Sequence, residues 1–138
     1  NIYRLEYLKK IKRENIENNL ILIVPGLHDG LLLLNKLQMY IMHRPEKKFI
    51  LKPHPRSNNF INGIPVKYNL NNISVGNQHI SDYLGKVSEI IVTYSSVGFE
   101  AYLLGIPIKL VCLNQKINES PLLDIYESVS DKQIEIIW

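Results

Sequence analysis

The sequence is poor in the residues from which covalent cross-links and metal sites are built. Its single cysteine, Cys112, lies inside an apolar run, so the chain forms no internal disulfide, and we expect this thiol to be buried in a reducing compartment. No cysteine–histidine spacing typical of zinc occurs and no Asp-x-Asp pair is present, so we expect no bound metal. No apolar run approaches the ~20 residues of a membrane-spanning helix.

The sequence also lacks the motifs of several large enzyme classes. No Gly-x-Gly-x-x-Gly follows the first expected strand, which argues against a nicotinamide or flavin site. No Gly-x-x-x-x-Gly-Lys-Ser/Thr is present, which excludes a P-loop NTPase at the level of the motif, and Ser95 does not lie in the Gly-x-Ser-x-Gly turn of α/β-hydrolases. The net charge of +3 is too small and too dispersed for a protein that binds nucleic acid.

What the sequence does contain is an alternation of short apolar runs with amphipathic stretches over 138 residues. We expect strands at 20–24, 48–52, 73–75, 89–93 and 108–112. We expect helices at 2–17, after Asp29 as the cap, at 79–87, at 96–104 and around 122–128. Strands separated in this way need crossover connections, so the pattern predicts one α/β domain, residues 1–138, with a Rossmann-like open parallel sheet and helices on both faces.

Three groups of polar residues each follow an expected strand, at 25–28, 52–56 and 93–96. In an open α/β sheet, ligands bind beyond the carboxyl ends of the strands, and the first amides of a helix attract anions. The three groups together therefore indicate a phosphate-bearing ligand held by backbone amides, hydroxyls, an imidazole and two cationic side chains. The residues that we assign to this site are Gly26, Lys52, His54, Arg56, Tyr94, Ser95, Ser96 and Glu100.

Each of these residues also has an interpretation that needs no ligand. Ser95 is a suitable helix N-cap, and Glu100 is an acid favoured by the positive end of a helix dipole. In that interpretation the others are turn residues, solvated loop charges or core residues: Gly26, Lys52, His54, Arg56 and Tyr94. The residues alone leave both interpretations open.

Several motifs of the chain resemble the C-terminal, donor-binding half of GT-B glycosyltransferases. They are Lys-Pro-His-Pro at 52–55, Ser-Asp-Tyr-Leu at 81–84, and the segment from 93 to 107 with its Ser-Ser, Glu-Ala and Gly-x-Pro elements. By pattern the chain is similar to bacterial surface-polysaccharide enzymes, namely capsule and polysialic-acid type transferases and the teichoic-acid glycerophosphotransferases. The resemblance covers roughly residues 20–112.

The resemblance assigns roles to individual residues. His54 and Pro55 match a His-Pro motif that faces the donor nucleotide, and Ser95 and Ser96 match a later Ser/Thr-rich motif with the same role. Glu100 matches the glutamate that reaches the ribose of the donor.

The resemblance also implies a reaction, in which a sugar or a polyol phosphate passes from a nucleotide-activated donor to a glycan acceptor. CMP- or CDP-linked donors are favoured, and no cofactor is needed. The amides of residues 96–98, including Val97, and the serine hydroxyls would stabilise charge on the leaving phosphate, with His54 as the catalytic residue. The implied enzyme is cytoplasmic and associates peripherally with the inner face of the membrane.

Two departures from the family pattern set limits. No second glutamate completes the E-x7-E pattern of retaining enzymes, because Pro107 and Ile108 occupy that region, and the N-terminal acceptor domain is missing. Because the first residue is Asn1, we expect the chain to be a piece of a two-domain enzyme, able to bind nucleotide but not to turn over alone. Two alternatives stay open: a sugar-nucleotide epimerase on the same fold, and a non-catalytic α/β binding module.

Overall fold

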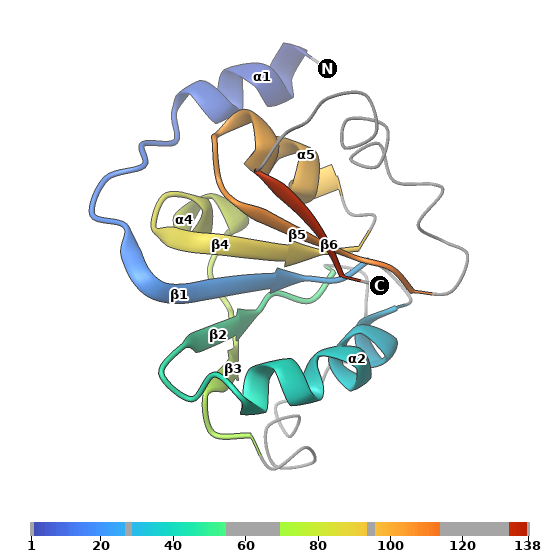
Figure 1. Ribbon diagram of the computed structural model, residues 1–138. Helices are drawn as coiled ribbons and strands as arrows, with labels where there is room; N and C mark the ends of the chain where they lie inside the picture. The colour runs from blue at the N-terminus through green and yellow to red at the C-terminus, as the bar shows by residue number, and fades with distance from the viewer. Residues whose placement is uncertain (1, 27–28, 55–69, 94–95, 114–132, 138) are drawn as a thin grey trace.

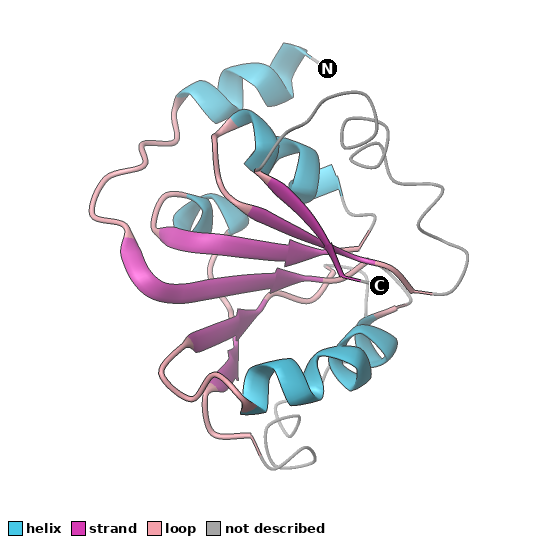
Figure 2. Ribbon diagram, in the orientation of Figure 1, coloured by secondary structure: helices cyan, strands magenta, loops and turns pink. Residues whose placement is uncertain are grey.

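The computed structural model describes residues 2–26, 29–54, 70–93, 96–113 and 133–137 of the chain. Within them, six strands form one sheet in the order β3-β2-β1-β4-β5-β6, and every neighbouring pair is parallel (Figures 1 and 2). The strands are β1 (Glu17–Val24), β2 (Lys48–Leu51), β3 (Ile73–Val75), β4 (Val87–Val92), β5 (Ile108–Val111) and β6 (Ile134–Ile137). The predicted Rossmann-like α/β fold is therefore confirmed.

Helices cover both faces of the sheet. They are α1 (Ile2–Lys9), α2 (Gly30–Met42), α4 (Ile80–Leu84) and α5 (Ser96–Leu103). Helix α2 packs on one face, whereas α4 and α5 pack on the other, with α1 on the same side as α5 (Figure 1). Among the described residues, no helix combines the length and the apolar character that crossing a membrane would require.

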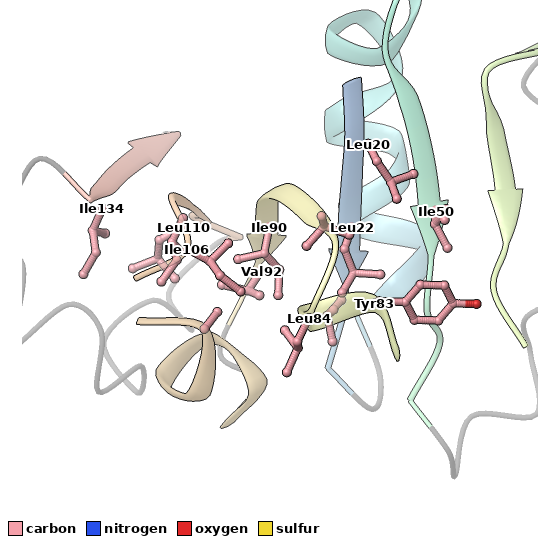
Figure 3. Close-up of a cluster of buried hydrophobic side chains, with 14 residues drawn as sticks. Leu20, Leu22, Ile50, Tyr83, Leu84, Ile90, Val92, Ile106, Leu110 and Ile134 are labelled. Carbon is pink, nitrogen blue, oxygen red and sulfur yellow. The ribbon is translucent and has the colours of Figure 1, made fainter. Parts of the chain in front are cut away.

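The apolar run at 20–24 is buried on both faces of the sheet. Leu20, Leu22 and Val24 belong to the core beneath α4 and α5, where Figure 3 shows Leu22 close to Tyr83 and Leu84 of α4. Ile21 and Ile23 point to the opposite face and belong to the core beneath α2. Burial on both faces is the environment that a continuous apolar run predicts for a central parallel strand.

The first helix is shorter than the sequence predicts. We expected it to continue to residue 17, but it ends at Lys9. Beyond it, the Arg13 guanidinium donates hydrogen bonds to the carbonyls of Leu84, at 3.0 Å, and Val87, at 2.6 Å. These bonds hold the segment against the connection between α4 and β4, so the Arg13 side chain makes a tertiary contact and does not lie on a helix face.

Other boundaries also differ from the predicted ones. Strand β1 begins at Glu17, three residues early, after Asn15 turns the chain with a left-handed φ of 56°. Helix α4 ends at Leu84 because buried Val87 already begins β4. The apolar run at 134–137, to which we had assigned no structure, forms β6, and the helix expected around 122–128 lies outside the described residues. Gly105 follows α5 with a left-handed φ of 77°, a conformation that glycine commonly supplies just beyond the end of a helix.

Candidate functional site

The strand order reverses between β1 and β4. From β1 the chain adds β2 and then β3 on one side, and it then crosses over to add β4, β5 and β6 on the other. The last residues of the two central strands, Val24 and Val92, lie opposite each other in the ladder. In open α/β sheets, ligands bind outside the carboxyl ends of the strands at this kind of reversal.

The three predicted polar groups follow β2, β1 and β4, which are neighbours in the sheet. Gly26 is buried two residues after β1, and the Lys52 amide, directly after β2, donates a 2.9 Å hydrogen bond to the carbonyl of Ile23. The side chains of Lys52 and His54 are half-buried, and Ser96 is the first residue of α5. The carboxyl ends of these strands therefore share one edge, while the predicted common cleft stays a prediction. Four assigned residues lie outside the described part of the chain: Pro55, Arg56, Tyr94 and Ser95.

A buried carboxylate connects the turns that follow β1 and β4. Oδ1 of Asp29 accepts a 2.6 Å hydrogen bond from the Gly26 amide, and Oδ2 accepts one of 2.6 Å from the Thr93 hydroxyl. Asp29 is 1% exposed and Thr93 is 2% exposed. Both bonds are short, as expected when the acceptor is charged. The two turns at the strand-order reversal are thus bound to one side chain.

The sequence had suggested a different role for Asp29. It does occupy the N-cap position of α2, and its carbonyl accepts a 2.9 Å hydrogen bond from the Leu33 amide. Its side chain, however, makes no capping hydrogen bond, so that prediction is wrong for the carboxylate. The side chain turns away from α2 because the Gly26 amide and the Thr93 hydroxyl bind its two oxygens.

Buried polar side chains of the described residues belong to the units β1–α2 and β4–α5. Besides Asp29 and Thr93, Glu100 in α5 is 6% exposed. Burying such groups is unfavourable unless they are bonded, so each of these side chains needs hydrogen-bond partners within the protein. Val97, one turn earlier in α5, packs partly against the apolar core. The assignments of Glu100 to a ribose and of Val97 to a phosphate stay predictions.

Lys36 is a cation at this edge that we did not identify from the sequence. From α2, its ammonium group donates a 2.8 Å hydrogen bond to the carbonyl of Cys112, directly after β5. Cys112 itself is buried, as predicted, and burial raises the pKa of its thiol. Helix periodicity places Lys36 on the exposed side of α2, but only the tertiary fold brings it to the end of β5.

Comparison with known proteins finds a structural neighbour but no sequence family. No family model matches the chain, and no curated protein matches its sequence. The fold is similar to that of KpsC, a beta Kdo 2,7 transferase from Thermosulfurimonas dismutans, with a TM-score of 0.51 and 25% sequence identity. The match covers 79% of this chain but 38% of KpsC, so this chain spans well under half the length of its neighbour. The chain therefore has a glycosyltransferase-like, Rossmann-type fold.

Proposed function

We propose that this chain is the donor-binding half of a glycosyltransferase. The enzyme would transfer a sugar, or a polyol phosphate, from a nucleotide-activated donor to a surface polysaccharide. The observation that carries the proposal is the similarity to KpsC. It extends over 79% of the chain and combines a similar fold with 25% sequence identity. Two of the three polar groups that suggested a nucleotide phosphate, at 25–28 and 93–96, also follow the two strands between which the strand order reverses.

The phosphate of the donor would lie at the start of α5 rather than at the start of α2. Both helices begin at the reversal, and each presents the positive end of its dipole there. At α2, however, the Asp29 carboxylate is already present and takes the Gly26 amide. A second anion there would be repelled, whereas the amides of 96–98 with the hydroxyls of Ser95 and Ser96 would receive it.

Cationic groups would then complete the site. Lys52, His54 and Arg56 follow β2, on the side of β1 opposite β4, and would approach the phosphates from across the reversal. As the bond to the donor breaks, negative charge grows on the leaving phosphate. That charge would be stabilised by oriented backbone amides, by the serine hydroxyls and by the imidazole of His54. The proposal includes no metal or cofactor.

The acceptor site and the general base would come from another domain. The chain spans 38% of KpsC, which leaves most of that enzyme without a counterpart here. The isolated chain should therefore bind donor nucleotide without transferring its sugar. In the cell the complete enzyme would act at the inner face of the membrane.

A nucleotide panel tests the proposal directly. The melting temperature of the chain should rise with nucleoside mono- or diphosphates, CMP and CDP among them, and much less with the corresponding nucleosides. No shift with any nucleotide at millimolar concentration would contradict the proposal. A complete enzyme that converts a free nucleotide-sugar without an acceptor would instead indicate the epimerase alternative.

A further inference from the structure

We propose that Asp29 is a positioning residue, whose carboxylate holds the turn after β4 in the geometry that presents the start of α5 to the donor phosphate. This inference rests on the proposed function. It concerns Asp29 and Thr93, neither of which was among the residues assigned to the site from the sequence. Asp29 would act through Thr93 and would not itself touch the donor.

The Asp29 carboxylate forms a bridge between Gly26 and Thr93, and this bridge lies beyond the last paired residues of β1 and β4. The ladder between β1 and β4 ends at the pair Val24 and Val92. Gly26 lies two residues beyond β1 and Thr93 one residue beyond β4, and Asp29 binds both at 2.6 Å. Because α5 begins at Ser96, three residues after Thr93, the bond to Asp29 anchors the chain close to the first amides of α5.

The chemistry of the bridge also suggests positioning rather than simple cohesion. Among the described residues, no cation pairs with Asp29, so its 1% exposed charge is held by hydrogen bonds alone. An apolar side chain could join the two turns without that desolvation cost, but it could not specify where each donor must lie. Because the two oxygens of one carboxylate accept from the Gly26 amide and the Thr93 hydroxyl, they fix the positions of these two donors relative to each other.

Substitutions of Thr93 separate the hydroxyl from the shape of the side chain. Thr93→Val keeps the branched shape and removes the bond to Asp29, while Thr93→Ser keeps the hydroxyl. Ser88→Ala is a matched control, because the Ser88 hydroxyl on β4 donates a 2.9 Å hydrogen bond to the carbonyl of Leu20 on β1. This substitution removes a side-chain hydrogen bond between β4 and β1 at a position remote from the carboxyl edge of the sheet.

The test measures dissociation constants of CDP, UDP, cytidine and uridine by titration calorimetry, with the melting temperature of each variant. For Thr93→Val we expect a loss of about tenfold or more for the nucleotide that binds the original chain, and less than about twofold for its nucleoside. Because Thr93→Ser keeps the hydroxyl, its nucleotide affinity should stay within about threefold of that of the original chain. Ser88→Ala should lower the melting temperature and leave the ratio of nucleotide to nucleoside affinity unchanged.

Asp29→Asn tests whether geometry or charge matters. The amide oxygen can accept from the Gly26 amide and the amide nitrogen can donate to the Thr93 hydroxyl, so we expect nucleotide affinity close to that of the original chain. If Thr93→Val weakens nucleotide and nucleoside equally, or lowers only the melting temperature, Asp29 is merely structural and the inference is overturned. If the original chain binds neither CDP nor UDP while it is folded, the proposed function itself fails in that test, and the inference falls with it.

Discussion

The ammonium group of Lys109 on β5 lies 2.6 Å from the Glu89 carboxylate on the neighbouring strand β4. Both side chains are mostly buried, with exposed fractions of 16% and 20%, and Oε1 of Glu89 has no hydrogen-bond partner. Replacing Lys109 by Met should therefore leave a poorly solvated carboxylate on the face of the sheet that α2 covers. We expect Lys109→Met to lower the free energy of unfolding by about 1–3 kcal/mol, measured by urea denaturation.

The same pair predicts a dependence of stability on alkaline pH. Burial lowers the pKa of Lys109, but the hydrogen bond and charge of Glu89, with smaller effects of Tyr40 and Glu135, raise it overall above its ordinary 10.5. The pair's contribution should thus be complete below pH 10.5 and be lost as pH rises through the higher folded pKa. The original chain should lose more stability than Lys109→Met between pH 10 and 12. Parallel losses in the two proteins would contradict this account.

Asn72 fixes the end of α2 to the start of β3. Its side-chain amide nitrogen lies 3.1 Å from the carbonyl of Ile41, 3.0 Å from that of Arg44 and 3.3 Å from that of Lys47. Asn72→Ala would remove these bonds to the end of α2 and to the connection between α2 and β2, and we expect a loss of about 1–2 kcal/mol in chemical denaturation. The neighbouring Asn71 is exposed, so Asn71→Ala is the control and should change stability by less than about 0.5 kcal/mol.

Gly76 is required by a close approach of β3's carboxyl end to α4. A Cβ atom at this position would lie 2.5 Å from the Tyr83 hydroxyl oxygen and 2.7 Å from Cγ2 of Ile50. Gly76→Ala should therefore destabilise the chain by about 1–3 kcal/mol, read from the thermal midpoint. Combining it with Tyr83→Phe should recover only part of this loss, because the contact with Ile50 persists. Full recovery would mean that the phenol oxygen alone is responsible.

The fold could be predicted from the sequence because its strands are short apolar runs with few alternatives. The run at 20–24 needs burial on both faces, and the centre of a parallel sheet between helices provides that environment. Helix ends were harder to predict, because charges such as that of Arg13 fit an exposed helix face as well as a tertiary contact. The polar run at 17–19 extends β1 because the Glu17 amide pairs with the carbonyl of Lys86, which is remote in sequence.

The bridge at the candidate site was beyond sequence reasoning for a similar reason. An aspartate just before a helix indicates a cap from local chemistry alone. Its actual partner, Thr93, is 64 positions away and becomes a neighbour only because β4 pairs with β1. A buried threonine directly after an apolar strand was a usable signal, since such a hydroxyl needs a partner within the protein.

The last prediction compares His54 with Ser96. If both face the donor phosphate, His54→Ala should weaken nucleotide binding more than Ser96→Ala, because bonds from a charged donor contribute about 1.5–3 kcal/mol and neutral ones about 0.5–1.5 kcal/mol. Both losses should shrink with the plain nucleoside, which carries no phosphate. His43, exposed at the opposite end of α2, provides the control, and His43→Ala should leave both affinities unchanged. Calorimetric titrations decide the matter: equal losses for nucleotide and nucleoside in His54→Ala would mean that the histidine shapes its turn without contacting phosphate.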